Sequence, residues 1–166
     1  QAIPAVEIGL RHLASVGMDT IRTRTRCLTA WMLERLLTLR HSNGRLMIRI
    51  YGPVTMEGRG GTVTMNVYDP DGCLLDYRRV EELASQERIS LRTGCFCNPG
   101  AGETAEGLTE ADMAAALRES ADMTLPRFLQ FVTHSSGKSA GGIRVSLGLV
   151  SNFADVYRFV HFVEEL

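Results

Sequence analysis

Two cysteines, Cys95 and Cys97, lie close together, and Arg92 precedes the second of them by five residues. The thiolate is the reactive form of cysteine and a nearby positive charge favours it, so Arg92 is suited to stabilising a thiolate or binding an anionic ligand. Residues 89–92 alternate apolar and polar side chains as a short strand does, and residues 98–100 are typical of a turn. The pattern predicts a strand that delivers a thiol into a loop, an arrangement that indicates sulfur chemistry.

The stretch R-T-G-C-F-C-N-P-G-A, residues 92–101, resembles the active-cysteine loop of molybdenum cofactor sulfurases. Those proteins carry a NifS-like, class V aminotransferase domain. In the wider cysteine desulfurase family the related loop reads R-T-G-x-x-C. The resemblance therefore makes Cys97 the catalytic residue and leaves Cys95 and Thr93 as possible accessory residues. The sulfurase pattern usually has a third cysteine just after G-A, whereas this chain has Gly102 there.

The resemblance also implies a reaction, a cofactor and partners. In this family a lysine on a large domain holds pyridoxal phosphate, which acts as an electron sink for bound L-cysteine. The loop cysteine attacks the substrate sulfur and keeps it as a persulfide while alanine leaves, and sulfurases pass this sulfur to the molybdenum cofactor. Residues 1–166 would then be the small carboxy-terminal domain, with the large domain outside this chain. The start at Gln1, directly followed by a helical pattern, indicates the same division.

A second arginine belongs to another predicted strand, residues 141–148. Apolar residues alternate there with Arg144 and Ser146, which places Arg144 on the polar face, as Arg92 is on its own strand. If the two strands are neighbours, two guanidiniums meet near Cys97. A planar guanidinium matches a carboxylate with two parallel hydrogen bonds.

The resemblance gives this carboxylate-binding task to Arg144, because it extends to I-R-V-S-L-G followed by S-N-x-x-D-V. We therefore expect Arg144 and Arg92 to bind substrate. For either arginine alone, a surface salt bridge is the alternative interpretation.

The rest of the chain alternates between helical and strand patterns. These patterns predict an α+β fold with a mainly antiparallel sheet of about four strands and helices packed on its apolar face. This architecture agrees with the small domain of fold-type I pyridoxal-phosphate-dependent transferases. The expected helices cover residues 4–16, 19–40 and 79–87 and the stretches after residues 109, 124 and 151, and the other expected strands cover 46–51 and 62–68.

Short polar residues indicate where several helices begin. Asp19 and Thr124 are expected N-caps, Ser151 or Asn152 caps the last helix, and Thr109 opens a capping box. The apolar pattern of each helix predicts which of its side chains lie in the core.

Cys27 lies beside the apolar stripe of its helix and is expected to be a small core residue. The last helix is expected to pack Phe153 and Tyr157 inward. The glycine-rich residues 100–107 are expected to be mobile.

Composition narrows the classes of function. The chain has 166 residues, of which 45% are hydrophobic, enough for one compact domain but not for a complete class V aminotransferase. The net charge of -1 argues against a nucleic-acid or membrane surface. There are 17 arginines and one lysine, Lys138, which is expected to be exposed in a loop.

The four cysteines are expected to be free thiols in the cytoplasm, because the chain has no signal peptide and is large enough to fold without disulfides. No metal site is predicted, since Cys95 and Cys97 lack a matching second pair and Cys27 and Cys73 belong to other elements.

Two alternatives to a sulfurase remain open at this point. One is a non-catalytic persulfide carrier or dimerisation module of the same fold, which a parent protein without a Schiff-base lysine would favour. The other is a class V desulfurase that serves iron-sulfur or thiolation pathways. A homodimer is expected for the complete protein. The sequence of the cysteine loop does not predict the sulfur acceptor.

Overall fold

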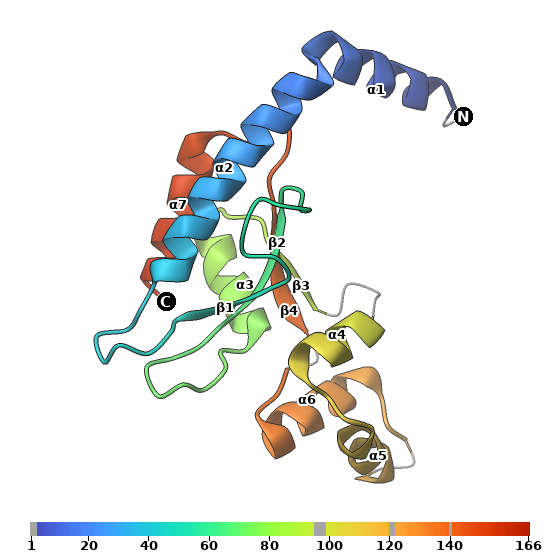
Figure 1. The fold of residues 1–166 in the computed structure, drawn as a ribbon. Coiled ribbons are helices and arrows are strands. Elements are labelled where there is room, and N and C mark those ends of the chain that lie inside the picture. Colours follow the sequence, from blue (N-terminus) through green and yellow to red (C-terminus); the bar gives the residue numbers. More distant parts are fainter. Residues whose placement is uncertain (1–2, 95–98, 120–121, 140) are drawn as a thin grey trace.

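The computed structural model describes residues 3–94, 99–119, 122–139 and 141–166 (Figure 1). Within those ranges, no helix combines the length and the apolar composition needed to cross a membrane. The elements are α1 (Ile3–Val16), α2 (Met18–Thr38), β1 (Ile48–Tyr51), β2 (Thr62–Val67), α3 (Tyr77–Gln86), β3 (Arg92–Gly94), α4 (Pro99–Glu106), α5 (Glu110–Glu119), α6 (Leu125–Ser136), β4 (Gly142–Ser146) and α7 (Phe153–Glu164).

The strands form one four-stranded sheet in the order β1-β2-β4-β3. Each neighbouring pair is antiparallel. The last strand in sequence, β4, lies between β2 and β3, so the segment from α4 to α6 is an excursion between two adjacent strands. The predicted α+β fold with an antiparallel sheet is confirmed.

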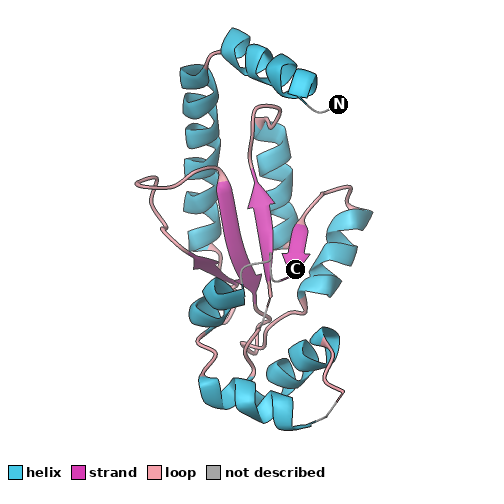
Figure 2. Ribbon diagram, turned by 90° about the vertical axis from the view of Figure 1, so that its right-hand side faces the viewer, coloured by secondary structure: helices cyan, strands magenta, loops and turns pink. Residues whose placement is uncertain are grey.

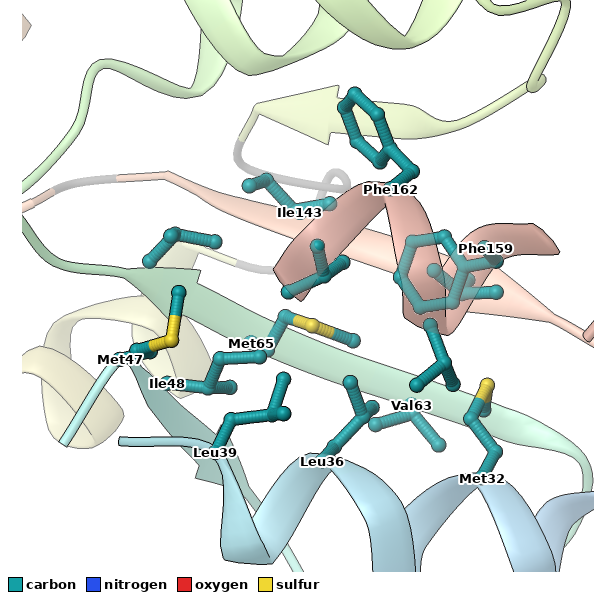
Figure 3. Packing of buried hydrophobic residues seen from close by; sticks show 14 of the residues in the cluster. Met32, Leu36, Leu39, Met47, Ile48, Val63, Met65, Ile143, Phe159 and Phe162 are labelled. Atoms are coloured by element: carbon teal, nitrogen blue, oxygen red, sulfur yellow. The ribbon is translucent and has the colours of Figure 1, made fainter. Parts of the chain in front are cut away.

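One face of the sheet carries the hydrophobic core, against α2, α3 and α7 (Figure 3). Met65 of β2 and Met32 of α2 are completely buried, and Ile143 of β4 is 1% exposed. Burying such side chains stabilises the fold by roughly 1.5–3 kcal/mol each. The covered face therefore supplies most of the packing in this structure.

The first two helices meet at Gly17, inside the break predicted between residues 16 and 19, but the predicted N-cap is wrong. Gly17 adopts φ 90°, a conformation that favours glycine, and α2 begins at Met18 with Gly17 as its N-cap. Asp19 lies in the first turn of α2 and is not the N-cap. Helix α1 extends beyond the end of the sheet (Figures 1 and 2), and its Val6 and Leu10 side chains are mostly exposed.

The assignments of Cys27, Phe153 and Tyr157 to the core are wrong, because all three side chains are exposed. The core stripe of α2 is narrower than the sequence pattern indicated, and the buried side of α7 is formed by its valines with Phe159 and Phe162. Phe153 instead meets the ring of Trp31 edge-on, with centroids 4.8 Å apart.

Residues 100–107 form helix α4 and its end, so the prediction of a mobile stretch is wrong. The helix ends in a Schellman motif, in which Gly107 has φ 66°. Leu108 N donates to Glu103 O at 2.8 Å, and Gly107 N donates to Thr104 O at 3.3 Å. Two early glycines concealed this helix in the sequence.

Helices α4, α5 and α6 lie together at one end of the sheet, opposite the end where α1 lies (Figures 1 and 2). The capping box before α5 is confirmed, with Thr109 N donating to Asp112 Oδ2 at 2.8 Å. Asn152 makes the expected cap of α7 as part of a full capping box. Thr124 is the N-cap of α6, as predicted, although its side chain makes no capping bond.

Candidate active site

A row of side chains crosses the sheet on the face away from the core. Tyr51 pairs with Thr64, Thr64 pairs with Arg144, and Arg144 pairs with Arg92. Residues directly opposite one another on neighbouring strands project from the same face, with Cβ atoms about 5 Å apart. The sequence analysis required the strands of Arg92 and Arg144 to be neighbours, and they are.

The two guanidiniums lie on one face without an acidic residue in their row. Arg92 is exposed and Arg144 is half-buried. Like charges directly opposite each other are destabilising in a sheet, and a bound anion would offset that repulsion. A carboxylate fits this place because a guanidinium can bind it with two parallel hydrogen bonds.

The adjacent row belongs to the other face. Thr93 pairs with Ile143, a core residue, and the Thr93 hydroxyl donates to Glu81 Oε2 of α3 at 2.7 Å. Thr93 therefore lies on the helix-covered face, away from Arg92 and Arg144. Its side chain secures β3 to α3.

Strand β3 leads directly toward the cysteines. Cys95 and Cys97 lie outside the described residues, which resume at Pro99. The end of β3 depends on glycines, because a Cβ at Gly141 would come 3.1 Å from the Gly94 carbonyl carbon and 2.9 Å from a ring carbon of Tyr77. The backbones of β3 and β4 thus approach closely just before the cysteine segment.

A polar network lies on the face of the sheet that carries Arg92 and Arg144, and it was not predicted. Asn66 of β2 is only 2% exposed. Its Nδ2 donates to Tyr51 Oη at 3.0 Å and to Glu106 Oε1 at 2.7 Å. Arg49 lies over the Tyr51 ring, 5.1 Å from the centroid, and donates to Ala105 O at 3.3 Å.

Burial controls the titration of this network. It raises the pKa of Tyr51, and the neighbouring Glu106 carboxylate raises it further, so the phenol stays protonated. Burial also raises the pKa of Glu106, an effect opposed by hydrogen bonds from Tyr51 and Asn66 and by the charge of Arg49. The alternation of β2 predicted the face on which Asn66 lies, but its hydrogen-bond partner Glu106 lies forty residues away, at the end of α4.

Lys138 lies in a loop, as predicted, but its side chain is only 32% exposed. Its ammonium donates to Asp112 Oδ2 at 2.7 Å and to Gly107 O at 2.8 Å. This contact lowers the pKa of Asp112 to about 2. Lys138 is the sole lysine of the sequence, and its bonds to Asp112 and Gly107 do not fit the lysine that would hold pyridoxal phosphate.

The chain is similar over nearly its whole length to proteins named molybdenum cofactor sulfurase. It is 37% identical over 163 residues to the protein of Solanum lycopersicum, a match covering 98% of this chain and 19% of that protein. It is 33% identical over 172 residues to the protein of Arabidopsis thaliana, covering 98% of this chain and 20% of the relative. The Bos taurus protein is 30% identical over 150 residues, which cover 89% of this chain and 16% of the relative.

The chain therefore spans about a fifth of the length of the first two relatives. No family model matches the sequence. Among solved structures, the apo structure of a cysteine desulfurase from Thermococcus onnurineus superposes with a TM-score of 0.58 at 19% identity. That superposition covers 95% of this chain and 28% of the other, and it shows a shared fold.

Proposed function

We propose that this chain, which is homologous to one segment of the molybdenum cofactor sulfurases, supplies the sulfur-accepting part of a cysteine desulfurase reaction. The observation that carries the proposal is the pairing of Arg92 with Arg144 on the face of the sheet away from the core. Arg92 begins the R-T-G-C-F-C stretch, in which the strand is followed directly by the cysteines. Cys97 is the proposed sulfur acceptor, since it matches the R-T-G-x-x-C pattern.

In this proposal, Arg144 binds the carboxylate of L-cysteine through two parallel hydrogen bonds. Arg92 adds positive charge at the base of the cysteine segment. An unperturbed thiol has a pKa of about 8.5 and is mostly protonated at neutral pH, so this charge favours the nucleophilic form of Cys97.

The sulfur transfer is balanced within the substrate and the loop thiol. The Cys97 thiolate forms an S–S bond with the sulfur of L-cysteine, and the C–S bond of the substrate breaks. Its electron pair goes to the substrate carbon, which takes up a proton, so that alanine is released and a persulfide remains on Cys97.

We propose that pyridoxal phosphate, which supplies the electron-sink chemistry of this class, is held in the complete protein by a lysine outside this chain. This assignment is supported by the ion pair of Lys138 with Asp112 and by the length of the relatives, of which this chain matches about a fifth. The chain alone would then lack desulfurase activity.

The acceptor of the persulfide sulfur is proposed to be the molybdenum cofactor, by analogy with the names of the relatives. A desulfurase with another acceptor would use the same arginines and the same thiol. The two differ only in the step after persulfide formation.

Kinetics of the complete protein test the carboxylate-binding role. Arg144→Lys keeps the charge but loses the paired geometry, so KM for L-cysteine should rise about tenfold or more. Arg79→Lys on α3 is the control, because Arg79 pairs with Glu82 on the exposed surface of the helix. Equal kinetics for the two variants would refute the proposed role of Arg144.

A further inference from the structure

The network around Asn66 has no part in the proposed chemistry, yet it connects three elements. Its amide nitrogen donates both to Tyr51 of β1 and to Glu106 at the end of α4. A buried polar side chain without partners destabilises a protein by about 1–3 kcal/mol, so these two bonds are what makes a buried asparagine tolerable on this strand. Burying Asn66 is therefore unfavourable unless α4 lies where Glu106 can accept its hydrogen bond.

The same end of α4 is held by two further contacts. Arg49 of β1 donates to Ala105 O, and Lys138, just before β4, donates to Gly107 O. The Schellman motif at Gly107 fixes the direction in which the chain leaves the helix. The carboxyl end of α4 is thus attached to β1, to β2 and to the segment before β4.

The amino end of α4 is where the chain returns from the cysteine segment. Pro99 begins the helix two residues after Cys97. Helix α4 has eight residues, which corresponds to a rod of roughly 12 Å. Because a helix is stiff over this length, holding its carboxyl end also sets the position of Pro99.

The other side of the cysteine segment is held separately. Strand β3 is paired with β4, and Thr93 is bonded to Glu81 of α3. The polypeptide on each side of residues 95–98 is therefore attached to the same sheet through different contacts. Among the described residues, only the attachment through α4 uses a buried polar side chain, Asn66, on the face of the sheet away from the core.

We propose that Asn66, Tyr51 and Glu106 are positioning residues for Cys97, acting through α4. The proposal rests on the sulfur-accepting role of Cys97 proposed above. None of the three is assigned contact with the substrate. Their effect is to hold α4, and with it the start of the helix at Pro99, at one place on the sheet.

Hydrogen exchange of the chain tests the attachment itself. Asn66→Ala removes both bonds, and amides of α4 should exchange about tenfold faster while those of β2 and β4 stay protected. Tyr51→Phe removes the bonds of the Tyr51 hydroxyl but keeps the bond between Asn66 and Glu106, so it should give a smaller increase. Ser146→Ala is the matched control, since Ser146 lies on the same face and meets the Thr62 hydroxyl at 3.4 Å.

If Asn66→Ala does not fold, Glu106→Ala answers the same question from the helix side, and Glu106→Gln keeps an acceptor oxygen for Asn66. Faster α4 exchange in Glu106→Ala that Glu106→Gln largely reverses is the expected result. Unchanged α4 protection in Glu106→Ala would overturn the proposal.

Steady-state kinetics of the complete protein test the consequence for catalysis. Glu106→Ala should lower kcat for persulfide formation about tenfold with KM for L-cysteine unchanged, and Glu106→Gln should restore most of it. Faster α4 exchange with an unchanged kcat would refute positioning and leave the sulfur-accepting role standing. Persulfide formation that survives Cys97→Ser would refute the sulfur-accepting role and leave the attachment of α4 unaffected.

Discussion

The two faces of the sheet are built from alternate residues of the same strands and differ in what specifies them. On the covered face, Met65 and Ile143 pack against helices, and the two-residue period of the strands was enough to place them there. On the face away from the core, the role assigned to Arg144 depends on which residue lies opposite it. Cross-strand register, a long-range property, turns two separate arginines into one candidate anion site.

Substitution in the core should have the largest effect on stability. Met65→Ala on β2 empties a fully buried position, so the free energy of unfolding should fall by about 2–5 kcal/mol. Urea denaturation followed by circular dichroism measures the change. A loss well below 1 kcal/mol would contradict the assignment of stability to the covered face.

Gly141→Ala would disturb the contact between the last two strands. The new methyl group would meet Gly94 and the ring of Tyr77 at distances of 2.9–3.2 Å, so we expect a loss of about 1–3 kcal/mol in unfolding free energy. Because β3 must shift relative to β4, KM for L-cysteine in the complete protein should also rise.

Gly148→Ala is the matched control for this change, since a Cβ there meets nothing within 4 Å. Equal stability and equal KM for the two alanine variants would show that the close approach of β3 and β4 has no bearing on the arginine pair.

The pH dependence of stability should be a smaller effect, and Glu106 and Asp112 should contribute to it with opposite signs. Burial raises the pKa of Glu106, so the folded chain binds this proton more tightly than the unfolded chain does. The contribution of Glu106 to stability is then greatest below its unfolded pKa of about 4.3 and declines as pH rises through the folded pKa. Glu106→Gln should remove that decline.

Asp112 should behave in the opposite way. Lys138 lowers the pKa of Asp112 to about 2, so its contribution is present above the unfolded pKa of about 3.9 and is lost as pH falls toward the folded value. Unfolding free energies of the parent, Glu106→Gln and Asp112→Asn chains should be compared between about pH 3 and pH 7. Parallel curves for all three would contradict both assignments.

The sequence was sufficient for the sheet and its core but not for the surroundings of the polar face. The alternation of apolar and polar residues assigned Asn66 and Arg144 to the correct face of the sheet, because successive side chains of a strand point to opposite faces. The hydrogen bond of Asn66 to Glu106 was not predictable, since Glu106 is a distant residue on a helix that two glycines made look like a loop. Recognising Gly107 and Leu108 as a helix end would have revealed α4.

Errors in the helices have a related cause. Periodicity identifies the apolar stripe of a helix but not how wide a stripe the neighbouring elements cover. Cys27 and Tyr157 lie just outside the covered width and are exposed, whereas Phe162 was not predicted to be buried and is. The ion pair of Lys138 was not predicted because its partner Asp112 lies 26 residues away.

The most direct test of the account is to locate the transferred sulfur. After the complete protein has been incubated with L-cysteine, the trapped peptide containing residues 95–98 is analysed by mass spectrometry. The account predicts one added sulfur on Cys97, its loss in Cys97→Ser and its retention in Cys95→Ser. Added sulfur on Cys95 that persists in Cys97→Ser would contradict it.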